Sequence, residues 1–141
     1  MSLTDEVSVE VVVEDGGSTG RGRMTVLRLS WRRTDPLAVA LVLTAQPDHP
    51  ALPRGTWLVL RDFLRYGLEE PTGDGDVRIA PDGTGRNVRL ELVRAGRPCP
   101  VTLPAKTVRD FLDSTEGIVP AGEEASEQAL DALIERLLAS G

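Results

Sequence analysis

The sequence predicts an α+β protein in which a group of strands followed by a helix occurs twice. Alternating apolar and polar residues mark several short strands in each group. The pentapeptide Leu60–Leu64 recurs as Val108–Leu112, and each copy has helical spacing and follows strands. The similarity does not extend upstream at this offset, so coincidence on two amphipathic helices stays open as the alternative. The 141 residues fit a single domain.

The first group begins with three strands. Alternation over residues 7–13 and again over residues 25–31 predicts two of them. Asp35-Pro36 is expected to break the second strand. Residues 37–45 are apolar on both faces, which predicts a central strand covered on both sides.

The first group ends in a short helix. A loop is expected over residues 46–55 because this segment holds three prolines. Residues 56–60 predict a short strand or the entry to a helix. Helical spacing then predicts a helix over residues 60–67, with Gly67 as its stop.

The second group begins after a cluster of turn residues at positions 71–75. Alternation predicts strands around residues 77–79, over residues 88–92 and over residues 99–103. Residues 95–98 are expected to form a hairpin turn between the last two strands.

Two helices are expected after these strands. Pro104 suits the first position of one helix, and Gly117 suits its end. The second helix is expected over residues 124–139, with acids near its start that favour the helix dipole. We leave open whether its apolar stripe packs in the core, joins protomers or receives a partner helix. The stripe comprises Ala129, Leu130, Leu133, Ile134, Leu137 and Leu138.

The charge of the chain bears on its partners. The formal charge of −6 disfavours nucleic acid, because neutralisation of phosphates supplies most of that affinity. Arg28, Arg32 and Arg33 nevertheless lie in a stretch that contains no acid. This stretch is interpreted either as a solvated surface with local pairing or as a modest basic face for an acidic partner.

The chain shows no feature of secretion or membrane insertion. Residues 1–6 lack a basic and then apolar pattern, and the charge-free stretch over residues 36–47 is too short to span a bilayer. The single cysteine, Cys99, cannot form an internal disulfide. We therefore expect a cytoplasmic location.

The residues do not predict an enzyme. The one histidine, His49, lies in a proline-rich loop with no partner at metal-ligand spacing, and no Gly-x-Ser-x-Gly motif is present. Cys99 has no histidine nearby in the sequence to activate it. The run of glycine and aspartate at residues 73–76 lacks the glutamate of a calcium loop, where Gly85 stands. We expect no metal and no cofactor.

The segment from Trp57 to Arg78 resembles the signature of the SsgA-like proteins, the sporulation and cell-division regulators of actinobacteria. Residues 35–39, 103–112 and 119–124 are similar to further segments of that family, so the resemblance covers nearly the whole chain. The chain departs from the family pattern before Asp35-Pro36, where a tyrosine is usual, and at Ala80, where an aromatic residue is frequent. Its branch within the family stays open, with the SsgB branch as one candidate.

The resemblance implies a non-enzymatic regulator that acts as a protein-interaction adaptor at division septa. One branch recruits the tubulin-like division protein FtsZ together with a second SsgA-like protein, and other branches influence septum and spore-wall remodelling. The implied fold has two antiparallel sheets with helices, resembles the whirly architecture, and assembles as a homotrimer. Single-stranded nucleic-acid binding, by analogy with that fold alone, is the alternative function.

The signature residues are expected to serve the scaffold. Gly67, Gly73 and Gly75 are expected to supply turn conformations, while Arg61 and Asp62 cap or pair at a helix start. Asp76 and Arg78 are expected to pair at a strand edge. The full set comprises Trp57, Arg61, Asp62, Gly67, Leu68, Pro71, Gly73, Gly75, Asp76 and Arg78.

Overall fold

The structure is a computed structural model that describes residues 5–15, 23–44, 55–123 and 127–140. The loop expected after residue 15, nearly all of the loop expected over residues 46–55, and His49 lie outside the described residues.

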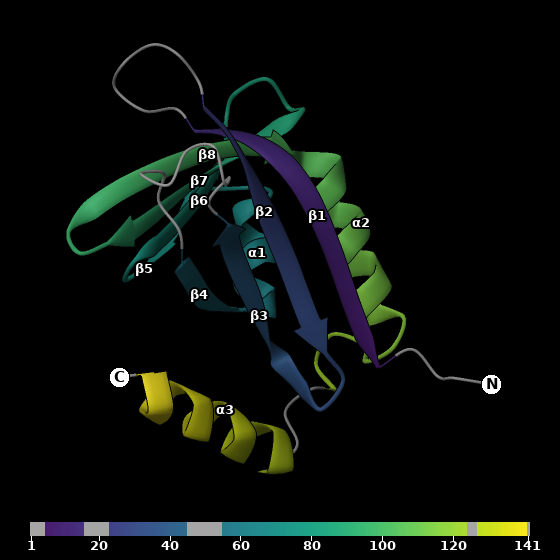
Figure 1. The fold of residues 1–141 in the computed structure, drawn as a ribbon. Helices are drawn as coiled ribbons and strands as arrows, with labels where there is room; N and C mark the ends of the chain where they lie inside the picture. The colour runs from purple at the N-terminus through teal and green to yellow at the C-terminus, as the bar shows by residue number, and fades with distance from the viewer. Residues whose placement is uncertain (1–4, 16–22, 45–54, 124–126, 141) are drawn as a thin grey trace.

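The chain forms two units of four strands and one helix, as the repeated pentapeptide predicts (Figure 1). The first unit comprises β1 (Glu6–Asp15), β2 (Arg23–Arg32), β3 (Asp35–Thr44), β4 (Gly55–Leu60) and α1 (Arg61–Gly67). The second comprises β5 (Thr72–Asp74), β6 (Val77–Pro81), β7 (Asn87–Arg94), β8 (Arg97–Pro104) and α2 (Ala105–Glu116). A third helix, α3 (Glu127–Ser140), follows.

The strands form two four-stranded antiparallel sheets that meet where β1 pairs with β8. The strand order is β4-β3-β2-β1-β8-β7-β6-β5, so β1 and β8 are the neighbours at the centre. Among the described residues, Glu14 pairs with Thr102 and Asp15 pairs with Val101 across this junction. In Figure 1 the strands of the first sheet run steeply past β7 and β8, which cross the picture. The predicted α+β class with two antiparallel sheets is confirmed.

The hydrophobic core lies between the sheets and the first two helices. α1 contacts β3 and β4 of the first sheet and β5 and β6 of the second, while α2 contacts β1, β7 and β8. Each helix therefore packs on both sheets, which joins the two units through buried apolar area. The largest fully buried apolar side chains are those of Leu27, Leu29, Trp31, Leu41, Leu43, Leu64, Ile79, Leu90, Leu92, Leu103 and Leu112.

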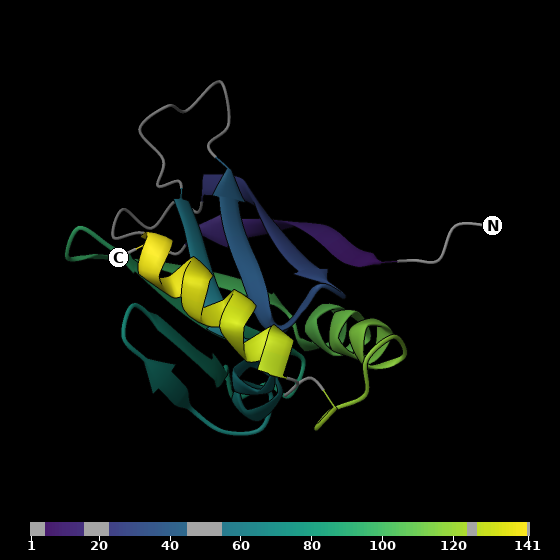
Figure 2. The same cartoon turned by 90° about the horizontal axis from the view of Figure 1, so that it is seen from below.

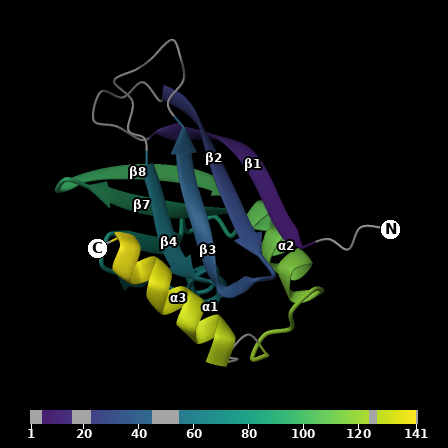
Figure 3. The ribbon, with the colours of Figure 1, turned by 60° about the horizontal axis from the view of Figure 1, so that its bottom comes forward.

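α3 lies on the outer face of the first sheet, over β3 (Figures 2 and 3). Val39 and Leu41 of β3 point to the core, while the neighbouring Ala38 is buried outside that core cluster. Further along this outer face, Val42 is half-buried. The prediction that both faces of β3 are covered is therefore confirmed around Ala38, whereas the outer face is only partly covered around Val42.

The break between the second and third strands lies before the predicted Asp35-Pro36. The turn falls at Arg33-Thr34, and Asp35-Pro36 opens β3 instead of breaking the sheet. The indole Nε1 of Trp31 donates a hydrogen bond to the Pro36 carbonyl at 2.9 Å, which holds this proline against β2.

Two further boundaries differ from the prediction. Pro104 is the last residue of β8 and the N-cap of α2, one position before the predicted place. The cluster at residues 71–75 is only partly a turn, because Thr72–Asp74 pair with β6 as the edge strand β5. Gly117 is the C-cap of α2, and α1 ends at Gly67, both as predicted.

Candidate interaction site

Trp57 and Arg61 tie distant parts of the chain together. The indole Nε1 of Trp57 donates to the Val93 carbonyl at 2.9 Å, which links β4 to β7 of the other sheet. Arg61 is 2% exposed, and its guanidinium lies 5.6 Å from the centre of the Trp31 ring, within the range of a cation–π contact. The same guanidinium donates to Thr115 Oγ1 at 3.3 Å and to the Pro120 carbonyl at 3.4 Å. Both side chains join the units.

The helix start is arranged differently from the expectation. Arg61 reaches across to α2 instead of pairing at its own helix start. α1 has no side-chain hydrogen bond at its N-cap, Leu60, and Asp62 is exposed in the first turn. An acid in the first turn interacts favourably with the helix dipole.

The three signature glycines have different structural reasons. Only Gly75 has a positive φ, of 60°, so the turn explanation is wrong for Gly67 and Gly73. A Cβ on Gly67 would lie 2.1 Å from Cγ2 of Ile79, so α1 can approach β6 this closely only with glycine. A Cβ on Gly73 would lie 3.2 Å from Cγ of Arg78, whose stem passes over the glycine.

Leu68 and Asp76 also have structural roles, in the core and in the turn between β5 and β6. Leu68 is half-buried and packs against the core. The backbone carbonyl of Asp76 accepts a hydrogen bond from the Val93 amide at 2.8 Å, so this residue closes the turn onto β7.

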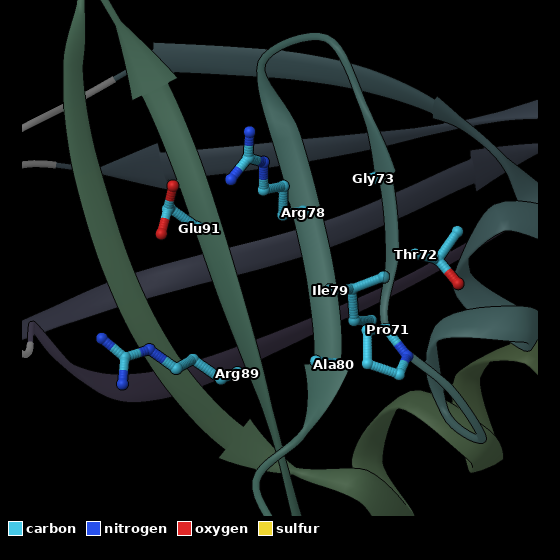
Figure 4. Close-up of a pocket in the computed structure, with 8 residues that line it drawn as sticks. All are labelled: Pro71, Thr72, Gly73, Arg78, Ile79, Ala80, Arg89 and Glu91. Atoms are coloured by element: carbon cyan, nitrogen blue, oxygen red, sulfur yellow. The ribbon is translucent and has the colours of Figure 1, made fainter.

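The remaining signature residues line an open groove on the outer face of the second sheet. Pro71, Gly73 and Arg78 contribute to it, and its volume is about 330 Å³. The other lining residues come from β5, β6 and β7: Thr72, Ile79, Ala80, Arg89 and Glu91. Figure 4 shows Arg78, Arg89 and Glu91 projecting from neighbouring strands, with Pro71 beside Ile79. The sequence motif alone did not reveal Arg89 and Glu91, because strand register brings them beside Arg78.

Two of the three arginines of the predicted basic face, Arg32 at the end of β2 and Arg33 in the turn after it, form ion pairs. Arg32 Nε lies 3.0 Å from a carboxylate oxygen of Glu6, and Arg33 Nη1 lies 4.0 Å from one of Asp5. Arg28 stands opposite Glu10 in the β1–β2 register. This arrangement fits the interpretation as a solvated surface with local pairing.

In the described residues, an ion pair and an apolar cavity lie between α3 and the first unit. Arg136 pairs with the buried carboxylate of Asp35. Leu133 and Leu137 line a cavity of about 290 Å³ with Leu58, Phe63 and other residues of the first unit.

The outward side of α3 is apolar and exposed. Ile134 is 53% exposed and Leu138 is 77% exposed, so these two residues do not pack in the core of this chain. The predicted stripe also includes Leu130, whose side chain lies outside the part of the chain that the structure describes. The structure therefore leaves protomer contact or a partner as the two uses of Ile134 and Leu138.

Among the described residues, Arg65 and Asp82 have shifted pKa values for structural reasons. Partial burial lowers the pKa of Arg65, but its hydrogen bonds to Asp113 and Glu116 of α2, at 3.0 and 2.6 Å, outweigh burial and raise it. The Thr84 hydroxyl and amide, both bonded to the Asp82 carboxylate, lower the pKa of that carboxyl. Arg65 joins α1 to α2, and Asp82 shapes a surface turn.

Over the described residues, no group of three or more histidine, cysteine, aspartate or glutamate side chains could hold a metal ion. Cys99 is buried. None of the helices in the described part of the chain is long and apolar enough to cross a membrane.

Comparison with known families gives a match over most of the chain. Residues 25–124 match the family model SsgA, described as Streptomyces sporulation and cell division protein. The sporulation-specific cell division protein SsgB of Thermobifida fusca is 31% identical over 135 residues, covering 94% of this chain and 92% of that protein. SsgB of Kineococcus radiotolerans is 32% identical over 138 residues, covering 94% of this chain and 80% of that protein.

Solved structures with the same fold carry related names. An SsgA-like sporulation-specific cell division protein from Thermobifida fusca superposes with a TM-score of 0.76 at 27% identity, covering 96% of this chain and 98% of that one. A structure from a study of SsgB mutations and longitudinal cell division during sporulation of Streptomyces coelicolor superposes with a TM-score of 0.73 at 28% identity. It covers 87% of this chain and 96% of that one.

Proposed function

Because the chain belongs to the SsgA family of sporulation and cell-division proteins, we propose that it regulates sporulation-specific cell division as a non-enzymatic adaptor between proteins. The adaptor acts at division septa and helps to place or promote the FtsZ ring, alone or together with another SsgA-like protein. The names of the relatives, sporulation-specific cell division proteins, support the assignment to this process. The action on FtsZ is our proposal.

The observation that best supports an adaptor is the accessible outer face of the second sheet. Arg78, Arg89 and Thr102 are exposed there, and the open groove lies on the same face. The signature segment thus builds both the joint between the units and an accessible surface. An accessible groove along strands is a kind of surface to which an extended segment of a protein partner can bind.

We also propose that the chain works as a homo-oligomer, with the trimer that the family resemblance implies. The exposed apolar residues Ile134 and Leu138 of α3 support an additional contact, because apolar side chains gain free energy when another chain covers them. Sedimentation velocity of the full chain tests this proposal. A monomer at all concentrations would contradict it.

Co-sedimentation with FtsZ polymers tests the adaptor role. The purified chain is mixed with FtsZ of the same organism and either GTP, which supports polymers, or GDP, which does not. We expect the chain in the pellet with GTP only, together with more polymerised FtsZ. Equal amounts of chain in the two pellets would contradict an adaptor that acts on FtsZ polymers.

The alternative, binding of single-stranded nucleic acid, is separated by a mobility-shift assay. Nucleic-acid binding would appear as a shift that weakens as salt rises, because counterions compete for the phosphates. The formal charge of −6 and the paired arginines on β2 favour the protein adaptor.

A further inference from the structure

We propose that the groove on β5, β6 and β7 binds an extended, acidic segment of a partner protein, whose carboxylates pair with Arg78 and Arg89. This proposal deepens the adaptor function and rests on it. The family match names no ligand for this groove, and the proposal assigns it acidic peptide segments as a ligand class.

The charges of the groove favour an acidic ligand. Arg78 and Arg89 are both exposed, and neither has a hydrogen bond or an ion pair to another described residue. Arg32, Arg33 and Arg65, by contrast, each lie within 4.0 Å of a carboxylate of this chain. The lining holds two arginines and one glutamate, so its net charge is +1 on a chain of −6. A local positive site on an acidic protein selects for negative charge at close range.

The spacing of the two cations matches an extended chain. Arg78 stands opposite Glu91 and Ala80 stands opposite Arg89, so the two arginines are diagonal neighbours on adjacent strands. Diagonal neighbours on one face lie about 7 Å apart. Alternate side chains of an extended segment are also about 7 Å apart, at roughly 3.3 Å per residue. Acids at every second position of a partner segment would therefore meet both arginines.

The edge of the sheet beside the groove is a place where a further part of the partner can bind. β5 is the last strand in the sheet order, so its second edge has no strand partner in the part of the chain that the structure describes. Gly73 on β5 has no side chain, and a Cβ there would lie 3.2 Å from Cγ of Arg78. Main-chain groups on such an edge can bond an added peptide strand.

The groove does not suit single-stranded nucleic acid. Binding of single strands relies on aromatic side chains that stack on the bases. The eight lining residues include no aromatic side chain.

A direct binding assay tests the proposal without FtsZ. The probe is a fluorescein-labelled peptide in which glutamate and valine alternate, measured by anisotropy against the full chain at low ionic strength. The variant Arg78→Glu with Arg89→Glu is compared with Arg97→Glu with Arg109→Glu. Arg97 and Arg109 are exposed and lie outside the groove lining, so this control changes the net charge equally. Circular dichroism and thermal melting show that each variant is folded.

We expect the groove variant to lose about tenfold in affinity for the acidic peptide, and the control variant to stay within about twofold of wild type. A peptide that alternates lysine and valine should not bind. Equal losses in the two variants, or no binding by wild type, would overturn the proposal. Tighter binding of a thymidine oligonucleotide than of the acidic peptide, lost in the same groove variant, would also overturn it.

The two proposals fail in different ways. If the groove binds the acidic peptide but wild type does not pellet with FtsZ, the groove has its ligand class and the adaptor acts on another protein. If wild type pellets with FtsZ and the groove variant pellets equally well, the adaptor stands and the groove is not its contact with FtsZ.

Discussion

The first unit buries its motif arginine, Arg61, against Trp31 and α2, whereas the equivalent residue of the second unit, Arg109, is exposed on α2. The units also differ on their outer faces. α3 covers part of the first sheet, while Arg78 and Arg89 on the outer face of the second sheet are exposed and pair with no described residue. The two copies of the supersecondary unit therefore differ. The first joins the halves through Arg61, and the second carries the exposed face for which we propose a partner.

Replacing the two motif arginines should break the comparison most clearly. Arg61→Ala removes a buried side chain that contacts both α2 and Trp31, so we expect a loss of about 3 kcal/mol in the free energy of unfolding. Arg109→Ala changes an exposed position and should cost less than about 0.5 kcal/mol. Urea denaturation of both variants measures the difference. Similar losses would show that the buried bridge does not hold the halves together.

The glycines that end the two helices offer a second matched pair. Gly67→Ala places a methyl group against Ile79 of the other unit, and we expect a loss of about 2 kcal/mol from overpacking. The control is Gly117→Ala, whose Cβ would meet ordinary contacts at 3.5 Å and whose φ of −67° suits alanine. Thermal melting compares the two. A stable Gly67→Ala variant would mean that α1 and β6 can separate without cost.

Releasing α3 should make the first outer face resemble the second. Arg136→Ala leaves the buried Asp35 carboxylate without its cation, and we expect a loss of about 1 kcal/mol. Hydrogen exchange should become faster in α3 and unchanged in α2. Glu135→Ala, at the neighbouring exposed position, is the control. Unchanged exchange in α3 would show that apolar contacts alone hold it.

The smallest expected effect is a pH dependence of the stability that Asp82 contributes in the β6–β7 turn. Hydrogen bonds from Thr84 lower the pKa of Asp82 in the folded state, so this contribution to stability is present above the unfolded pKa of about 3.9. It is lost as the pH falls through the folded value. A carbon-13 titration should place the pKa of Asp82 below its ordinary value, and Thr84→Val should move it back up. An ordinary pKa in wild type would contradict this reading of the turn.

Periodicity in the sequence was enough to predict the units and nearly all strands. The repeated pentapeptide located α1 and α2, because amphipathic spacing is a local property. It did not distinguish Arg61 from Arg109, whose burial depends on Trp31 and Thr115, far away in the chain.

The errors have the same origin. By local rules Asp35-Pro36 should interrupt a strand. The indole of Trp31 on β2 nevertheless bonds to the Pro36 carbonyl and holds this dipeptide in the sheet. The groove combines residues from three strands, so its composition depends on register that no single segment specifies. Glycine at position 67 is explained by a neighbour, Ile79, and not by its own backbone angle.

The close approach of α1 to β6 also has an evolutionary consequence. Positions 67 and 79 share one small volume, so neither can enlarge unless the other shrinks or the helix moves. Substitutions at the two positions should therefore co-vary among relatives, with a smaller residue than isoleucine at position 79 wherever glycine is lost at position 67. Pairs of relatives that keep isoleucine beside a larger residue would reveal family members in which the two halves are set further apart.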